Sequence, residues 1–324
     1  MILLPARKDG KFGYVNREAS WIIEPRFDLA FSFHDGLALV AVLRKNFWGA
    51  FRHRYGYIDE SGRMKIKPRF KEAFSFSEGL ATTVSSGPGR DLWGYIGMTG
   101  KYVIRPRFQA TGSFFDGLAQ ASISSSIGYI NSEGSFIISP RFDAAGDFSE
   151  ELAAVRLEGE RRWGYIHRCG EIVIRPVFNW AEAFSEGLAR VNRDGRWGFI
   201  DRSGAYVFQP IFDYAYDFSE GMAPYAIKRT YSEVLRVKSG GKWGYIKKNG
   251  MEGIRACFDR ALPYSNGLAR VMIDGGWSYI DLEGRLITEA RFDDVTDFHG
   301  GIAMVWIGKN AFVIDTEGNT TAIK

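Results

Sequence analysis

Cysteine is scarce in this 324-residue sequence, which contains only Cys169 and Cys257. A small secreted domain held by several disulfides and a zinc module rich in cysteine ligands are therefore both excluded. The sequence also has no run of 18 apolar residues, so it offers no membrane-spanning helix. The apolar part of residues 1–7 is too short for a signal peptide, and we expect a cytoplasmic protein that does not engage a membrane.

Residue arrangements that support catalysis are missing as well. The four histidines and two cysteines show none of the short paired spacings that bind a metal ion. Neither a phosphate-binding glycine loop nor the Gly-x-Ser-x-Gly turn of a serine nucleophile is present. We therefore expect a protein that is not an enzyme and that holds no cofactor or metal.

Aromatic residues and glycine, by contrast, are abundant. Rings make up 15% of the chain, glycine occurs 38 times, and 45% of all residues are hydrophobic. This composition is that of a globular protein with a large core. Rigid rings combined with turn-forming residues favour many short strands over long helices, and the composition predicts an all-β fold.

A four-residue motif, aromatic–glycine–aromatic–aliphatic, recurs along the chain. Its base period is 34 residues, as from Trp163 to Trp197 and from Trp243 to Trp277. The copies begin at Phe12, Tyr55, Trp93, Ile127, Trp163, Trp197, Trp243 and Trp277, with a worn ninth copy at Ala311. A fixed period of this length is typical of repeat proteins, in which each repeat covers the apolar surface of its neighbour.

Two further elements keep step with this motif. A Pro-x-Phe element follows most copies, and a Phe-Ser-Glu-Gly-Leu-Ala segment, clearest at Phe184–Ala189, comes next. Taken together, the three elements resemble those of the WG repeat family, which is named for its Trp-Gly pair. The resemblance covers residues 2–323, with Ser278 and Phe312 replacing the glycine. It implies a protein of the kind found mostly in bacteria, whose repeat array serves as a binding module.

The sequence of a single repeat predicts the fold of every repeat. Residues 188–191 and 197–201 form strands joined by an Asp-Gly turn, and residues 206–209 form a third strand that Pro210 ends. Residues 212–218 lead to the next repeat, as a tight turn whose rings enter the core. Each repeat is thus expected to be a short three-stranded antiparallel meander, which needs a neighbour for stability.

The glycine between the two rings has a predicted role in stacking. In a strand, Trp197 and Phe199 point to one face and Gly198 to the other, where its missing side chain lets a neighbouring backbone or ring approach. We therefore expect this glycine to make the fit between successive repeats possible.

The repeats are expected to form a single domain over residues 1–324. Both ends look complete, since residues 2–25 and 302–323 each contain a whole meander. We therefore expect an open superhelical β-solenoid, with a closed propeller-like ring of eight or nine blades as the alternative. The predicted units are 2–36, 37–79, 80–117, 118–151, 152–187, 188–221, 222–267, 268–301 and 302–324.

Arginine recurs directly after the proline or its substitute. In stacked repeats these arginines would form a basic row, a surface suited to a nucleic acid or an acidic protein. The interpretation we favour is that each one covers an aromatic ring of the adjacent repeat or pairs with a recurring aspartate, because charges common to most repeats usually serve the repeat. The row consists of Arg26, Arg69, Arg107, Arg141 and Arg291.

Recurring carboxylates have a similar explanation. They follow the Phe of Pro-x-Phe, as at Asp28 and Asp259, or lie in the Ser-Glu-Gly turns, as at Glu78 and Glu186. We expect hydrogen bonding in turns rather than acid–base catalysis, because a residue found in nearly every repeat is more simply a turn former.

Insertions that break the repeat are better indicators of function, since the fold does not require them. Two lie in the turn before the Trp-Gly strand, at Leu43–Arg54 and Ile227–Gly241, and both are basic with interleaved rings. Either they contact a partner or they are merely extended hairpins. The predicted partner-binding residues are Arg44, Phe47, Trp48, Phe51, Arg52, Arg54, Arg229, Tyr231 and Arg236.

The sequence therefore predicts a non-enzymatic scaffold or adaptor. It would bind a protein partner through its extended repeat surface and the inserted hairpins. The alternative is binding of a nucleic acid or another polyanion through the arginine row and the 43–54 loop, although the formal net charge is only +4.

Overall fold

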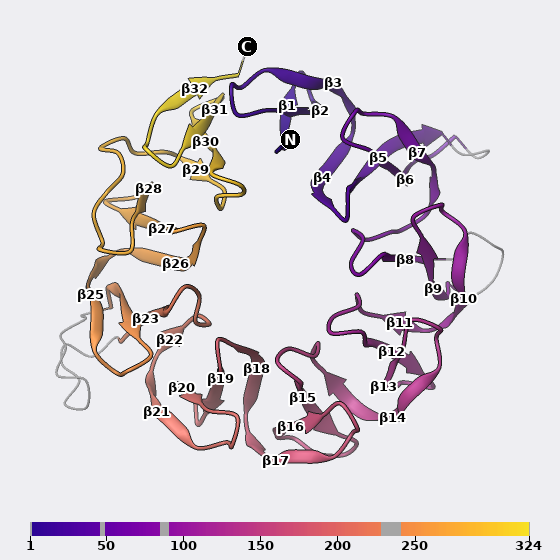
Figure 1. Cartoon of the computed structure of the whole chain (residues 1–324), viewed down its shortest axis with the longest axis vertical. Coiled ribbons are helices and arrows are strands. Elements are labelled where there is room, and N and C mark those ends of the chain that lie inside the picture. Colours follow the sequence, from indigo (N-terminus) through magenta and orange to yellow (C-terminus); the bar gives the residue numbers. More distant parts are fainter. Residues whose placement is uncertain (1, 46–48, 85–90, 228–240, 324) are drawn as a thin grey trace. The chain divides into compact units, whose positions relative to one another are not determined.

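The computed structural model describes residues 2–45, 49–84, 91–227 and 241–323. Within these ranges the chain is all-β, with a tandem series of small antiparallel sheets and no helix (Figure 1). Contacts divide the chain into two compact units. The first comprises Met1–Asn16, Ser20–Glu160 and Ile166–Glu171, and the second comprises Arg17–Ala19, Arg161–Tyr165 and Ile172–Lys324.

In the first unit the strands of each sheet follow one another in chain order. The sheets are β1–β3, β4–β7, β8–β10 and the run that begins at β11. The strands are β1 (Leu4–Lys8), β2 (Lys11–Val15), β3 (Trp21–Phe27), β4 (Leu29–His34), β5 (Leu37–Lys45), β6 (Phe51–Ile58), β7 (Met64–Phe70), β8 (Leu80–Val84), β9 (Trp93–Gly97), β10 (Tyr102–Phe108), β11 (Ala110–Thr111), β12 (Ala119–Ile123), β13 (Ser126–Ile130), β14 (Phe136–Ala145) and β15 (Leu152–Leu157).

The second unit is built in the same way. Its sheets are β18–β21, β22–β25, β26–β28 and β29–β32. The chain passes from one unit to the other around β16 (Trp163–His167) and β17 (Ile172–Phe178). The remaining strands are β18 (Trp180–Ser185), β19 (Leu188–Arg193), β20 (Arg196–Ile200), β21 (Tyr206–Phe212), β22 (Tyr214–Ala215), β23 (Met222–Ala226), β24 (Trp243–Lys247), β25 (Glu252–Phe258), β26 (Arg260–Ser265), β27 (Leu268–Ile273), β28 (Gly276–Ile280), β29 (Asp294–Val295), β30 (Ile302–Ile307), β31 (Asn310–Asp315) and β32 (Thr320–Ala322).

The meander predicted for one repeat is present, with one correction. Strands β19, β20 and β21 pair in order, but β21 runs through Pro210 as far as Phe212. The pairing shifts register between Trp197 and Phe199 on β20, so the partner strand bulges at the proline. A bulged strand tolerates proline because the missing N–H leaves no ladder bond unmade.

The segment after this strand differs from the prediction too. Residues 212–218 were expected to form a tight turn, whereas Tyr214 and Ala215 form β22 and pair with Tyr225 and Ala226 of the following repeat. Four sheets therefore carry a fourth strand, contributed by the segment that follows Pro-x-Phe. This pairing adds backbone hydrogen bonds to the side-chain packing between neighbouring repeats.

The glycine of the motif makes the predicted close approach, but within its own repeat. A Cβ atom added to Gly94 would lie 2.5 Å from the carbonyl oxygen of Ile104 and 2.6 Å from the nitrogen of Pro106. Gly198 faces Phe208 in the same way. The expectation that this glycine fits successive repeats together is therefore wrong. It accommodates the bulge in the outer strand of its own sheet.

The repeat that lacks this glycine shows the consequence. Ser278 takes the glycine position in β28, is fully buried, and donates to the carbonyl of Thr288 (3.3 Å). In this repeat the segment 281–293 forms only isolated bridges to β28, at Trp277–Phe292 and Ile280–Leu286. A side chain at this position thus coincides with loss of the continuous outer strand.

The second ring of the motif, rather than the tryptophan, is the centre of the core. Its side chain is fully buried, and its hydroxyl donates to the carbonyl 17 residues later, as Tyr57 does to Phe74 (2.7 Å). The ring of Tyr57 also packs edge-on against Phe76, with centroids 4.8 Å apart. The tyrosines with this hydrogen bond are Tyr14, Tyr57, Tyr95, Tyr129, Tyr165, Tyr245 and Tyr279.

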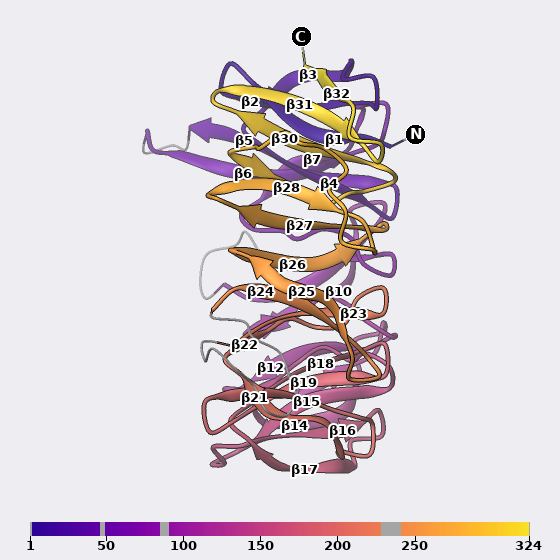
Figure 2. The same ribbon diagram turned by 90° about the vertical axis from the view of Figure 1, so that its left-hand side faces the viewer.

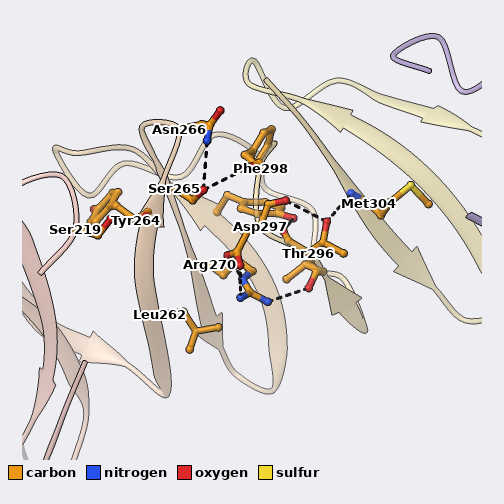
Figure 3. Close-up of polar contacts among 12 residues, drawn as sticks. Ser219, Leu262, Tyr264, Ser265, Asn266, Arg270, Thr296, Asp297, Phe298 and Met304 are labelled. Atoms are coloured by element: carbon orange, nitrogen blue, oxygen red, sulfur yellow. Dashed lines mark hydrogen bonds and ion pairs between the residues drawn. The ribbon is translucent and has the colours of Figure 1, made fainter. Parts of the chain in front are cut away.

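Successive repeats are joined by side chains that bind backbone. Ser77 donates to the carbonyl of Phe114 (2.7 Å), and the carboxylate of Glu78 accepts the N–H of Gly117 (3.0 Å). In the second unit Ser265 donates likewise to Phe298 (3.1 Å; Figure 3). Each repeat therefore supplies the side chains that satisfy polar backbone groups of the next repeat.

Candidate partner-binding surfaces

The first insertion forms an extended hairpin. Strands β5 and β6 continue for four residue pairs beyond Ala41–Tyr55, whereas β19 and β20 continue for one pair beyond the equivalent Asn192–Trp197. Figure 2 shows β5 and β6 reaching past the neighbouring β7. The predicted hairpin extension is therefore present, and Leu43, Arg44, Lys45, Phe51 and Arg52 of it are exposed, whereas Val42 still packs on the core.

The two faces of this hairpin differ in chemistry. Arg44 lies directly opposite Arg52, and Arg54 is the next residue on that face. The other face carries Leu43 opposite His53 and Phe51 opposite Lys45. Leu43 and Phe51 are 45% and 61% exposed. The hairpin thus presents a basic face and a partly apolar face, because directly paired residues of two strands share one side of a sheet.

The basic face has no acidic counterpart. Arg52 and Arg54 donate only to neighbouring backbone carbonyls, and no acidic side chain among the described residues pairs with Arg44, Arg52 or Arg54. The other predicted interface residues, Phe47, Trp48, Arg229, Tyr231 and Arg236, lie outside the described residues.

Most arginines of the predicted basic row stabilise the repeats. Arg69 lies over the ring of Phe70, with its guanidinium carbon 5.0 Å from the centroid, and donates to the carbonyl of Gly100 in the next repeat (2.6 Å). Arg26, Arg107 and Arg141 make the same pair of contacts in their repeats.

Arg291 is the exception in this row. It donates to the nearby carbonyls of Glu289 and Ala290, in the repeat whose outer strand is interrupted. Four of the five arginines therefore cover a ring, but it is the ring of the phenylalanine that follows in their own repeat, so the expectation of a ring in the adjacent repeat is wrong. These four arginines do not pair with the recurring aspartates, because each donates instead to the carbonyl of a turn glycine in the next repeat.

We expect removal of one such guanidinium to weaken the fold. Arg107→Met keeps the aliphatic stem but loses the ring contact and the bond to Gly134, which together contribute about 1–2 kcal/mol. Urea unfolding measures the change. Arg105→Met is the matched control, since Arg105 is exposed on the same strand and makes neither contact; equal effects of the two substitutions would contradict the assignment.

A groove of the same kind occurs in both units. In the first unit it has a volume of about 440 Å³. In the second unit its volume is about 450 Å³, and residues at five equivalent repeat positions line both grooves. The first-unit groove is lined by Phe31, Leu39, Tyr55, Glu72, Ala73, Phe74 and Ser75. We call the second the aromatic groove, lined by Arg190, Trp197, Tyr214, Ala215, Tyr216, Trp243, Asp259 and Arg260.

Comparison with known families identifies the family of this chain. The family described as WG containing repeat matches eight segments of it. These are residues 12–42, 55–84, 93–124, 127–160, 163–197, 197–231, 243–277 and 277–309. The chain belongs to the WG repeat family.

Comparison with solved structures gives matches at low sequence identity. The crystal structure of a eukaryotic initiation factor covers 98% of this chain and 94% of its own, with 11% identity and a TM-score of 0.64. The β-propeller domain of the Trilobed protease from Pyrococcus furiosus covers 92% and 98%, with 9% identity and a TM-score of 0.45. At 11% identity the first likeness concerns the fold alone. No curated protein matches the sequence.

The tryptophan that names the WG repeat lies at the rim of these grooves. Trp197 and Trp243 are partly exposed and line the aromatic groove, while Tyr55 occupies the same position in the first-unit groove. The side chains at the groove positions change from one WG repeat to another while the backbone frame is kept. A surface with a fixed frame and variable lining is typical of recognition by repeat proteins.

Sequence reasoning missed the grooves. The available signal was the ring pair Tyr214 and Tyr216, which stands where the equivalent segment of another WG repeat has Glu72 and Phe74. These residues were assigned to the core, but Tyr214 is 47% exposed.

The recurring carboxylates act as turn residues, as expected. Asp28 accepts the N–H of Leu43 and pairs with Lys11, and Asp259 accepts the N–H of Asp274. Glu186 accepts the N–H of Gly221 in the next WG repeat. Among the described residues, no group of three or more acidic, histidine or cysteine side chains is placed to hold a metal ion, and no helix could span a membrane.

Proposed function

We propose that this WG repeat protein is a non-enzymatic scaffold that binds a partner protein, with the β5–β6 hairpin as its principal contact. The observation that carries the proposal is the hairpin's extension beyond the repeat, with an unpaired basic face and exposed Leu43 and Phe51. Such an extension buries little of its own surface, so folding alone gives no reason to keep it.

The charge arrangement favours an acidic partner surface. Like charges directly opposite in a sheet destabilise it, and Arg44 faces Arg52 without a neighbouring carboxylate among the described residues. An acidic partner would relieve this repulsion and accept bidentate hydrogen bonds from the guanidinium groups.

A protein partner agrees better with these surfaces than a nucleic acid. Four arginines of the basic row are already bound to rings and backbone carbonyls, so they leave no continuous track of free cations for phosphates. The apolar face of the hairpin supplies the kind of contact that proteins use at the centre of an interface.

The test compares partner capture from lysate of the native host by two charge-matched triple variants. We expect Arg44→Glu/Arg52→Glu/Arg54→Glu to lose the partner by about 100-fold or more in affinity, while its unfolding transition stays within about 0.5 kcal/mol. The control, Lys67→Glu/Arg105→Glu/Arg175→Glu, changes three exposed cations elsewhere and should retain the partner. Phe51→Ser tests the apolar face separately.

Two outcomes would contradict the proposal. Loss of binding in both triple variants would indicate attraction by net charge alone. Capture that nuclease treatment abolishes, with affinity falling steeply and linearly with the logarithm of salt concentration, would assign the hairpin to a nucleic acid instead.

The open superhelical array and its alternative, the closed ring of eight or nine blades, stay predictions. A closed propeller usually has one sheet that combines strands from both chain ends. Here the sheets β1–β3 and β29–β32 each take all their strands from one end of the chain, which supports the open array. Spin labels on exposed residues of β1 and β32 distinguish the open array from the closed ring. A ring requires a short and narrowly distributed distance between the two labels, whereas an open array does not.

A further inference from the structure

The aromatic groove presents rigid, near-parallel rings. Trp243 stacks against Tyr216, with centroids 5.5 Å apart and planes 28° apart, and against Tyr214 at 6.0 Å and 24°. On the other side the guanidinium of Arg190 lies 4.4 Å from the centre of Trp197 and 5.8 Å from that of Tyr216. The groove therefore offers an ordered, ridged apolar surface, whose rings lose little entropy when a ligand binds.

Two charged side chains beside these rings are already engaged. Arg190 pairs with Glu182 (3.3 Å) and Asp217 (3.1 Å) and donates to the carbonyl of Ala215. Asp259 pairs with Lys242 and accepts the N–H of Asp274. A ligand of this groove cannot pair with Arg190 or Asp259 without breaking bonds that hold the repeat.

Arg260 is different from these groups. It is exposed at the groove, and its guanidinium lies 5.9 Å from the ring centre of Trp277. No hydrogen bond or ion pair to it occurs among the described residues. It is thus the cation of the groove that remains available to an anionic group of a ligand.

We infer that the aromatic groove binds a proline-bearing peptide segment in polyproline II conformation, with an acidic side chain paired to Arg260. Such a segment has no internal hydrogen bonds, its prolines have no N–H to satisfy, and its conformation is ordered before binding. Aromatic grooves bind this conformation through ring contacts, which is the contact that this groove provides.

Other ligand classes agree less well with these side chains. A sugar presents many hydroxyls that require polar partners, and the charged Arg190 and Asp259 beside the rings are occupied. A nucleic acid strand would bring phosphates close to Glu182, Asp217 and Asp259. A strand-forming peptide would need backbone acceptors along the groove for each N–H.

The first-unit groove is the natural control. It has Leu39 where the aromatic groove has Arg190, and Glu72 where that groove has Tyr214. It lacks an available arginine, and a carboxylate lies where a ring would contact proline. The inference therefore predicts an acidic proline peptide on the second unit and none on the first.

The experiment selects displayed random peptides on the intact protein and measures the chosen peptides by tryptophan fluorescence. We expect enrichment of two or more prolines with an aspartate or glutamate at a fixed spacing. Arg260→Glu should lower affinity about tenfold or more and, on reselection, should enrich lysine or arginine at the acidic position. Tyr216→Leu and the milder Trp243→Phe should weaken every selected peptide.

Matched variants separate the groove from other effects. Arg255→Glu makes the same charge change at an exposed position of β25, and Phe74→Leu alters the first-unit groove; both variants should bind the peptide normally. Selection of peptides without proline, or peptide binding that Arg260→Glu leaves unchanged, would overturn the inference. So would binding of a thymidine oligonucleotide or a cello-oligosaccharide that is lost in the Trp243→Phe variant. The hairpin variant Arg44→Glu/Arg52→Glu/Arg54→Glu should leave peptide binding intact, because the hairpin is not part of the aromatic groove. If no proline peptide binds the groove, the scaffold proposal for the hairpin is therefore unaffected.

Discussion

Gly94→Ala is expected to lower the free energy of unfolding by about 3 kcal/mol or more. The added methyl group would lie 2.5 Å from the carbonyl oxygen of Ile104 and 2.8 Å from the Cα of Pro106, and neither backbone atom can turn away as a side chain could. The outer strand β10 would have to leave the sheet. Urea unfolding measures the loss, and hydrogen exchange of β10 amides locates it.

The control for this substitution is Gly146→Ala in the same unit. There an added Cβ would lie 3.6 Å or more from the nearest atoms, and the backbone of Gly146 is not in the left-handed region. We expect a change of less than about 1 kcal/mol at Gly146. If both variants unfolded alike, the close approach of the outer strand would not be what selects glycine in this motif.

Alkaline pH is expected to unfold the protein steeply. Burial raises the pKa of nine tyrosines well above the ordinary value of 10, so each keeps its proton in the folded state while the unfolded chain releases it. The folded state then binds more protons, and stability falls as pH rises above 10 and is unaffected below it. The nine are Tyr14, Tyr57, Tyr95, Tyr129, Tyr165, Tyr225, Tyr245, Tyr264 and Tyr279.

The expected effect is large because the sites add. Each tyrosine lowers the free energy of unfolding by about 1.4 kcal/mol per pH unit above 10. The first unit holds four of them, which together remove about 5–6 kcal/mol per pH unit. A domain of ordinary stability would therefore unfold within about two pH units.

Tyrosinate absorbance and circular dichroism, followed together, measure this transition. The nine buried tyrosines should ionise only as the β signal is lost. Tyr129→Phe should make the pH dependence shallower by one proton, and Phe199 shows that a repeat accepts phenylalanine at this position. Gradual ionisation of all tyrosines near pH 10 with an unchanged β signal would contradict the assignment.

Much of the fold was predictable because the motif is local. Alternating residues such as those of 188–191 and 197–201 determine strand positions, and the turn residues between them determine the hairpins. Pro210 misled the prediction of where the third strand ends, since a bulge is invisible in one sequence. The pair Tyr214–Ala215 forms a strand only because the next repeat supplies a partner, and two residues carry no periodicity of their own.

The candidate sites divide in the same way. The β5–β6 hairpin was visible as an insertion with basic and aromatic residues, because it is continuous in sequence. The aromatic groove takes Arg190, Tyr216 and Trp243 from separate strands and the segments between them, and only the tertiary structure brings these together. The role of Gly198 was misassigned since the sequence shows that a side chain is absent, but not which backbone occupies its place.

The bonds between repeats have an evolutionary consequence. Ser77 and Glu78 reach main-chain atoms of the following repeat, and backbone atoms are the same whatever residue bears them. A duplicated repeat would therefore find acceptors and donors for these two side chains in any neighbour. Exposed side chains can change without disturbing these bonds.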